Sequence, residues 1–234
     1  MKTILVTGAS RGIGLEWTRQ CLDRGHRLLA TCRSPDNARG LLKLRESYAD
    51  LLDILPVDVE DEGSATRLFS ELEKKSESID LLFNNAGIID WEDMLDVSSA
   101  SMEKIYKVNV VGALLVLRAA IPCLRRSANP VVVNVSSRLG SIELRGNTQL
   151  GGAMAYQCSK AALNMLTKQA SIDLAPFGIT VLSQSPGWVR TGMGGSDAKF
   201  SVEESVTNML GHLENAGLSL NGKFIGEDGV ELPW

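Results

Sequence analysis

A tyrosine and a lysine four positions apart form the pair in this sequence best suited to proton transfer. Tyr156 and Lys160 stand at the start of an apolar segment of helical period, residues 161–175, and this spacing places both side chains on one helix face. A free tyrosine has a pKa of about 10, but a neighbouring ammonium group stabilises the phenolate. We therefore expect Lys160 to lower the pKa of Tyr156, so that Tyr156 can exchange a proton with a carbonyl oxygen. An isolated pair of this kind is more often an ordinary helix-face contact.

A glycine-rich turn directly follows the first apolar run of the chain. Its glycines have the spacing GxxxGxG, and a segment of helical period follows at residues 15–24. Glycines here permit a tight strand-to-helix turn and let the backbone approach a pyrophosphate, while the helix N-terminus offers N–H groups to the anion. Such a turn can also simply connect two elements. We predict a dinucleotide site that includes Gly8, Ser10, Arg11, Gly12, Ile13 and Gly14.

The end of the second apolar run indicates which dinucleotide binds. An NAD-binding unit carries an acidic residue there that bonds the ribose hydroxyls, whereas this run ends in Cys32-Arg33. Arg33 and Arg11 together are suited to a 2′-phosphate, because guanidinium groups bind phosphate oxygens in a bidentate manner. The sequence therefore predicts NADP (NADPH) as the cofactor. The alternative is that both arginines are solvated surface side chains.

The elements that must position these residues alternate along the chain. Short β-branched or leucine-rich runs are separated by longer segments of helical period, and the runs are apolar on both faces, as parallel strands covered by crossover helices are. No repeat or linker divides the chain. We predict an α/β fold over residues 1–234 as a single dinucleotide-binding domain, a doubly wound Rossmann-type three-layer sandwich with a seven-stranded parallel sheet. The predicted strands are residues 3–7, 27–31, 52–57, 81–83, 131–135, 179–183 and 223–225.

These motifs, in this order, resemble the short-chain dehydrogenase/reductase family in its compact, single-domain branch, over nearly the whole chain. The resemblance also rests on motifs that follow the third to sixth predicted strands and on one helix. Segments 135–141, 159–164, 186–191 and 221–224 resemble the carbonyl-reductase branch that contains the sniffer-type enzymes and the bacterial C-factor. The further motifs are Asp58, Asn84-Asn85-Ala86-Gly87, Asn109, Asn134-Val135-Ser136-Ser137 and Pro186-Gly187.

The resemblance implies one site with four chemical roles. Tyr156 would be the acid–base residue and Ser137 the hydroxyl that polarises the carbonyl. Lys160 would bind the cofactor ribose and modify the pKa of the tyrosine, and Asn109 would belong to a proton relay. The resemblance further places adenine beside Asp58 and Val59, ribose below Asn85, Ala86 and Gly87, the nicotinamide carboxamide near Pro186, Gly187 and Val189, and the pyrophosphate at Thr191.

Three residues or segments near this site have competing interpretations. Ser136 and Ser137 cannot both point at the site, because residues of a strand alternate between its faces; the family pattern favours Ser137. The interval from Ser137 to Tyr156 is longer than in much of the family, so residues 146–152 are either a surface excursion or a substrate-contacting loop. Cys158 resembles a nucleophile by position, but it has no histidine near it in sequence, which favours a structural thiol.

Composition excludes several classes of partner. Acidic residues number 28 against 24 basic ones, which gives a formal net charge of −4, so we expect no nucleic-acid partner. The four cysteines have no CxxC spacing, which favours a reducing compartment over a disulfide scaffold. The two histidines lie in no cluster with metal-ligand spacing, so we expect no metal site.

We also expect no membrane segment. The first apolar run ends at Val6, too early for the apolar region of a signal peptide. The longest apolar stretch, residues 108–124, is interrupted by polar and helix-breaking residues and so falls short of the ~20 residues that a bilayer span needs. Together with the cysteine pattern, this predicts a soluble, cytoplasmic protein.

The sequence therefore predicts an NADP(H)-dependent carbonyl reductase or alcohol dehydrogenase that acts on a small carbonyl or alcohol substrate. The alternative is a cofactor-binding signalling or redox-sensing protein of the C-factor type. Segments 105–124 and 156–174 are apolar on more than one face, more than a helix covering one side of a sheet requires. Because these helices pair between subunits in the resembled family, we expect a homodimer or a homotetramer.

Overall fold

A seven-stranded, fully parallel sheet forms the centre of the computed structural model, which describes residues 1–146, 152–213 and 217–234. The strand order is β3-β2-β1-β4-β5-β6-β7. The chain therefore builds outward from β1 in one direction and returns to continue from β4 in the other, so the order reverses between β1 and β4. The strands are β1 (Thr3–Val6), β2 (Arg27–Cys32), β3 (Leu52–Pro56), β4 (Leu81–Asn84), β5 (Val131–Val135), β6 (Thr180–Gln184) and β7 (Phe224–Ile225).

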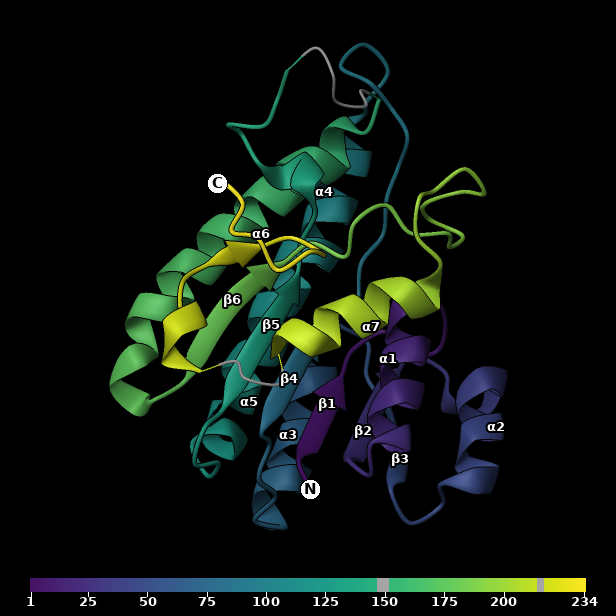
Figure 1. The fold of residues 1–234 in the computed structure, drawn as a ribbon, viewed down its shortest axis with the longest axis vertical. Coiled ribbons are helices and arrows are strands. Elements are labelled where there is room, and N and C mark those ends of the chain that lie inside the picture. The colour runs from purple at the N-terminus through teal and green to yellow at the C-terminus, as the bar shows by residue number, and fades with distance from the viewer. Residues whose placement is uncertain (147–151, 214–216) are drawn as a thin grey trace.

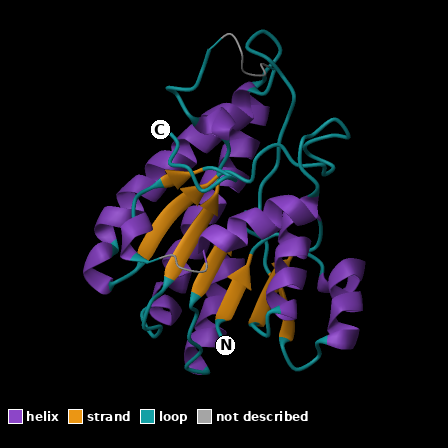
Figure 2. Cartoon of the chain, viewed as in Figure 1, coloured by secondary structure: helices purple, strands orange, loops and turns teal. Residues whose placement is uncertain are grey.

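Helices cover both faces of the sheet, which confirms the three-layer prediction (Figures 1 and 2). One face carries α1, α2 and α7, and the other carries α3, α5 and α6, with α4 packed against α6. The carboxyl ends of all seven strands lie at one edge, where ligands bind in doubly wound sheets. The helices are α1 (Gly12–Asp23), α2 (Arg39–Ser47), α3 (Glu62–Lys74), α4 (Ser99–Tyr106), α5 (Gly112–Leu124), α6 (Met154–Asp173) and α7 (Val202–Leu213).

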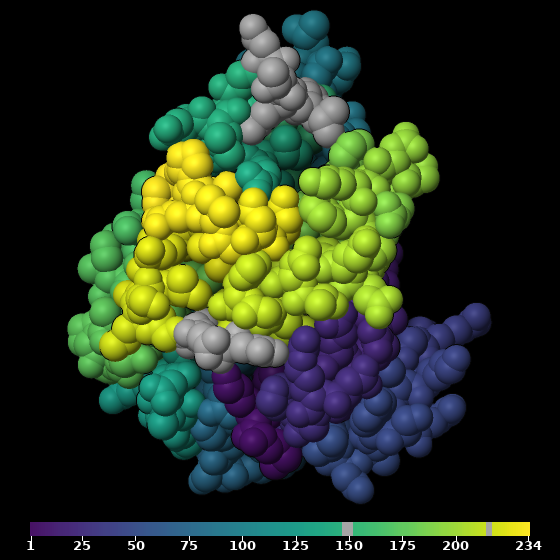
Figure 3. Space-filling model, in the orientation of Figure 1, coloured from purple at the N-terminus to yellow at the C-terminus, as the bar shows by residue number. Residues whose placement is uncertain are grey.

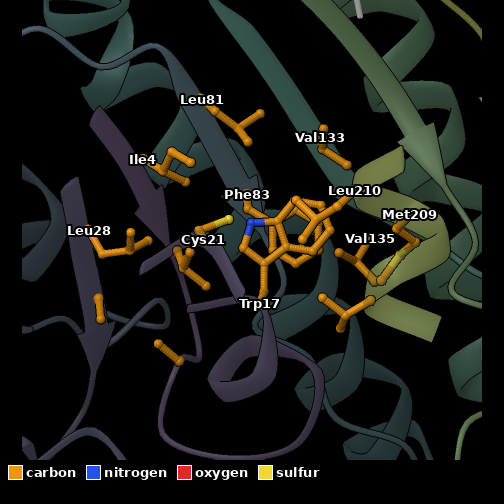
Figure 4. Close-up of a cluster of buried hydrophobic side chains, with 14 of the residues drawn as sticks. Ile4, Trp17, Cys21, Leu28, Leu81, Phe83, Val133, Val135, Met209 and Leu210 are labelled. Atoms are coloured by element: carbon orange, nitrogen blue, oxygen red, sulfur yellow. The ribbon is translucent and has the colours of Figure 1, made fainter. Parts of the chain in front are cut away.

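Alternation along the strands divides the core between the two faces. Ile4 and Val6 of β1 join the core under α1 and α7, whereas Leu5 between them joins the core under α3 and α5. Both faces need apolar side chains, which explains why the strands are continuous apolar runs. In the first core, the rings of Trp17 and Phe83 stack with centroids 3.7 Å apart, which packs α1 onto β4 (Figure 4).

A single long helical stretch, Ser99–Leu124, joins α4 and α5 through a π-helical turn at Lys107–Val111. By length and composition its 26 residues suffice to cross a membrane, which corrects the expectation that no segment would. The interrupting residues lower the hydropathy less than expected, and 56% of the most apolar window is buried within the fold. The core helix of a globular protein has the same properties, so this segment does not by itself indicate a membrane.

The predicted strands match the structure to within one residue at each end, and two further differences concern the first helix and Asn109. The first helix begins at Gly12, three residues before the predicted start, because the helix takes up the glycines of the turn itself. Asn109 lies in the π-helical turn rather than in regular α-helix, and such turns occur often at functional sites.

Candidate active site

Tyr156 and Lys160 lie buried on one face of α6, in its first two turns. Their exposed fractions are 8% and 5%, although both carry polar ends. The Lys160 ammonium donates a 2.7 Å hydrogen bond to the carbonyl oxygen of Val135, at the end of β5. It lies 5.5 Å from the centroid of the Tyr156 ring. The helix therefore holds the predicted pair against the carboxyl edge of the sheet.

The structure distinguishes the two adjacent serines. Ser137 hydrogen-bonds through its side chain with Tyr156, and its hydroxyl also accepts from the backbone N–H of Leu139 at 3.2 Å. Ser136 is turned away, since its hydroxyl donates to the Asn164 side chain at 2.6 Å inside the fold. Of the two serines, only Ser137 shares the site with the tyrosine.

Asn109 fixes the chain that follows β4. Its amide group donates 2.9 Å hydrogen bonds to the carbonyl oxygen of Ile88 and to the hydroxyl of Ser159, and its Oδ1 accepts from the N–H of Ile88 at 2.9 Å. A Cβ on Gly87 would lie 3.2 Å from that Oδ1 and 3.7 Å from the Lys160 ammonium nitrogen. Asn109 and Lys160 therefore both approach Gly87, and Lys160 links this point to the Tyr156 ring.

Burial sets the protonation of the central pair. It lowers the pKa of Lys160 from 10.5 to about 8 and raises the pKa of Tyr156 from 10.0 to about 12, with the Ser137 hydrogen bond acting in the opposite direction on the tyrosine. The expectation that Lys160 would lower the pKa of Tyr156 is thus wrong for this structure. The ammonium lies over the ring face and bonds to the carbonyl oxygen of Val135. The main cause of both pKa shifts is therefore the desolvation of the two buried groups. Tyr156 remains a neutral phenol that can donate a proton.

The glycine turn packs too closely for side chains at two of its positions. A Cβ on Gly14 would lie 2.5 Å from the Gly8 carbonyl oxygen, and Gly8 itself has a φ of +64°. The Asn85 amide donates to the carbonyl oxygens of Thr7 and Gly8 at 3.0 and 3.2 Å. The Thr7 hydroxyl accepts from the N–H groups of Asn85 and Ala86. The chain after β4 is thereby fastened to the turn.

The N-terminus of α1 provides a surface that fits a pyrophosphate. Gly12 opens the helix with a φ of +55°, and a Cβ placed there would meet only Thr191, at 3.6 Å. The first-turn N–H groups of a helix have no partner within the helix and attract anions. Thr191, predicted at the pyrophosphate, therefore does lie beside the glycine turn. Ser10 and Ile13 of the turn are half-buried.

Arg11 and Arg33 are both exposed at this edge of the sheet. Arg11 is the residue before α1 and Arg33 follows β2. Within the described parts of the chain, neither guanidinium group has a hydrogen-bond or ion-pair partner. Both are therefore available to an anion.

The other predicted cofactor residues end strands or form turns. At the end of β3, Asp58 accepts from the N–H of Glu60 at 3.0 Å, and Val59 packs where a Cβ on Gly112 would lie. After β6, the Pro186 carbonyl oxygen accepts from the Ser205 hydroxyl at 2.7 Å. Gly187 has a φ of +77°, and Val189 is 4% exposed. All of these lie at the ligand-binding edge of the sheet.

Some residues at the site were not singled out from the sequence. Thr7, Asn164 and Ser159 each hold a predicted site residue or its neighbour through the bonds given above. Each lies within a predicted motif, so the motif indicated that the residue is near the site. Its hydrogen-bond partner, however, depends on the fold and could not be read from the motif. Residues 147–151 of the inserted stretch lie outside the described residues. Cys158 is a half-buried free thiol.

A doubly wound parallel sheet with a glycine turn where its strand order reverses, and the cluster of Ser137, Tyr156 and Lys160 nearby, defines a Rossmann-type dinucleotide-binding α/β protein. The chain belongs to the short chain dehydrogenase family, whose model matches residues 2–201.

Known proteins similar to this chain include reductases and a signal protein. It is 35% identical to an NADPH-bound carbonyl reductase from chicken fatty liver, with a TM-score of 0.94 over 100% of this chain and 99% of that one. The carbonyl reductase Sniffer of D. melanogaster is 33% identical, with a TM-score of 0.92 over the whole of both chains. C-signal of Myxococcus xanthus is 42% identical over 67% of this chain and 93% of its own length. These relatives match the branch indicated by the sequence motifs.

Proposed function

We propose that this protein is an NADP(H)-dependent carbonyl reductase or alcohol dehydrogenase. The observation that carries the proposal is the cluster in which half-buried Ser137 bonds to buried Tyr156 while Lys160 stands over the tyrosine ring. A neutral phenol beside a second hydroxyl supplies the proton and the hydrogen bond that a carbonyl oxygen needs as it becomes an alcohol. Membership of an oxidoreductase family agrees with this chemistry.

Four side chains would share the work of reduction. NADPH, when bound, supplies the hydride for the carbonyl carbon. Tyr156 donates its phenolic proton to the carbonyl oxygen, and Ser137 donates a hydrogen bond to the same oxygen. Lys160, held against the end of β5 by its bond to the Val135 carbonyl oxygen, would bind the cofactor ribose. Asn109 holds the chain after β4 that borders the site.

The preference for NADP over NAD is part of the same proposal. The second strand ends without an acidic residue, and Arg11 and Arg33 are exposed at that edge. The chicken reductase, similar over the whole chain, was solved with NADPH. Two available guanidinium groups suit the 2′-phosphate that distinguishes NADPH from NADH.

The remaining cofactor contacts, the assembly and the location are proposed on the following grounds. Asp58 and Val59 would border adenine, Asn85 to Gly87 the ribose, and Pro186 to Val189 the nicotinamide, because all follow strands at the ligand-binding edge.

Partly exposed apolar side chains on α4, α5 and α6 favour a homodimer or a homotetramer. Four free thiols favour a reducing compartment such as the cytoplasm.

A second candidate function is favoured by the similarity to C-signal. In that alternative, the bound cofactor would stabilise a surface that a partner recognises, and turnover would be absent. The buried pair of Tyr156 and Lys160 argues for the enzyme, because a binding protein has no need to bury an ammonium group beside a phenol.

An NADPH-oxidation screen distinguishes the reductase from the signalling protein. The purified protein would be offered aldehydes, ketones, quinones and 3-oxoacyl thioesters, with the Tyr156→Phe protein as the control. We expect NADPH consumption with at least one class and none with the control. NADPH binding without turnover of any class would contradict the reductase and favour the signalling alternative.

A further inference from the structure

The C-terminal segment folds back onto the edge strand of the sheet. After β7, the N–H of Gly226 donates to the carbonyl oxygen of Val230 at 2.8 Å, and the N–H of Leu232 donates to the carbonyl oxygen of Phe224 at 2.7 Å. Figure 3 shows these yellow residues against the teal-green chain that follows β5. We term residues 226–234 the C-terminal clasp.

The end of the clasp is held by the chain that follows Ser137. The carbonyl oxygen of Trp234 accepts from the backbone N–H groups of Ile142 and Glu143, at 2.9 and 3.2 Å. The Ser141 hydroxyl lies 2.8 Å from the carbonyl oxygen of Pro233 and 3.2 Å from that of Trp234. Ser141 is fully buried, so this contact lies inside the fold rather than on a mobile surface.

The start of the clasp makes a second contact, one residue after Ser137. The Arg138 guanidinium pairs with Glu227 at 3.1 Å and with Asp228 at 3.4 Å. The approach is close, because a Cβ on Gly226 would lie 2.7 Å from an Arg138 nitrogen. On its other side Glu227 borders the proposed nicotinamide turn, since a Cβ on Gly187 would lie 3.1 Å from its Cγ.

A third contact joins the clasp to the helix that carries the tyrosine. The Trp234 ring packs on buried Phe224, with centroids 5.6 Å apart, and the Lys168 ammonium of α6 lies 5.9 Å from the same ring. The clasp therefore touches β7, α6, the chain after Ser137 and the turn at Gly187. None of these contacts includes a group that would react.

We propose that the C-terminal clasp positions Ser137 against Tyr156 by holding the segment Arg138–Glu143 from outside the site. Ser137 lies two residues beyond the end of β5 and caps a short 3-10 turn, Arg138–Gly140, whose Gly140 packs on α6, so β5 and α6 hold it only from the inner side. The contacts at Arg138 and at residues 141–143 supply the other side. This inference rests on the proposed function, because Ser137 matters only where a carbonyl oxygen is polarised. Trp234 and Arg138 are thus positioning residues.

The test compares kcat in three variants of the clasp. Trp234→Ala removes the ring that packs the clasp onto Phe224, and Trp234→Phe keeps an aromatic ring there. Glu231→Gln also lies in the clasp but removes only an exposed ion pair with Lys223. Displacements of about 1 Å can cost ~10²-fold in rate. We expect Trp234→Ala to lose roughly 10- to 100-fold in kcat for carbonyl reduction, Trp234→Phe to recover most of it, and Glu231→Gln to match the parent. The Kd for NADPH should stay within about 2-fold in all three, since the contacts given for Trp234 and Glu231 include no proposed cofactor residue.

Two readouts separate positioning from general destabilisation. The Ser137 hydrogen bond lowers the pKa of Tyr156, so Trp234→Ala should move the pH profile of alcohol oxidation to higher pH. Hydrogen exchange at the N–H groups of Ile142 and Glu143 should accelerate in the same variant, while exchange in β1 and α1 stays unchanged.

The controls make failure of this inference distinguishable from failure of the proposed function. Ser137→Ala is measured beside the clasp variants. If Ser137→Ala loses turnover but Trp234→Ala keeps the parent kcat and pH profile despite faster exchange at Ile142, the clasp does not position Ser137. If Ser137→Ala itself keeps full turnover, the assigned role of Ser137 fails and the inference fails with it.

Discussion

Replacing Lys160 by methionine tests whether the ammonium group is buried at a cost to stability. The variant keeps a long unbranched side chain but removes the charge. Burial lowers the pKa of Lys160 from 10.5 to about 8, which corresponds to about 3 kcal/mol at about 1.36 kcal/mol per pH unit. Because the folded-state value is the lower one, the unfolded chain binds more protons between these two pH values, and stability rises with pH across this range.

The assay is equilibrium denaturation of both proteins, under reducing conditions, at intervals from pH 7 to pH 10. Below pH 8 the difference between their unfolding free energies should be constant. By pH 10 the parent should gain about 2 to 3 kcal/mol relative to Lys160→Met. The raised pKa of Tyr156 contributes stability that is lost only as the pH rises towards about 12, so it does not interfere within this range. Two parallel stability curves would refute the reasoning, because they would mean that the ammonium is solvated.

Three further predictions concern the cofactor, the packing of α6 and the assembly. Arg33→Asp should lower kcat/KM for NADPH by roughly 10- to 100-fold, because it replaces a phosphate-binding cation with a carboxylate that repels the phosphate. The same change should leave kcat/KM for NADH nearly unchanged or raise it. Equal use of both cofactors by the parent would contradict this prediction. Gly140→Ala should cost about 1–3 kcal/mol in stability and lower kcat, because the added Cβ would lie 2.6 Å from the Lys160 Cβ. Gly146→Ala, whose added Cβ would meet nothing within 4 Å, should change neither stability nor kcat. Denaturation and steady-state kinetics measure these two quantities, and equal behaviour of the two variants would contradict the prediction. Light scattering should give at least twice the monomer mass of 25.3 kDa, because Tyr106 and Met165 are 46% and 70% exposed on α4 and α6; a stable monomer at micromolar concentration would rule this out.

Local sequence patterns were enough to predict the layers and the strand positions. Runs such as residues 131–135 are apolar on both faces, and only a sheet covered on both sides uses such runs. The glycine turn was also predictable from the sequence, because the close approach of Gly14 to Gly8 leaves no room for a side chain. These features depend on neighbours in sequence or on repeated strand geometry.

What the sequence did not predict depends on contacts between distant segments. The direction of the Tyr156 pKa was expected wrongly, since spacing puts Lys160 on the same helix face but does not reveal that the ammonium bonds to Val135 and that both groups are buried. The contact of Trp234 with Ile142 joins residues far apart in the chain. The membrane-length apolar stretch was underestimated, because its polar interruptions are accommodated within one continuous helix.

The most direct test of the central claim is the kinetics of Tyr156→Phe. The change removes one hydroxyl, which bonds to Ser137, and leaves the ring and the rest of the site in place. On a substrate that the parent reduces, kcat should fall by ~10²- to 10⁴-fold, the usual contribution of a general acid, while the Kd for NADPH stays within about 3-fold of the parent. A kcat near that of the parent, with NADPH bound as tightly, would show that Tyr156 does not supply the proton and would contradict the proposed mechanism.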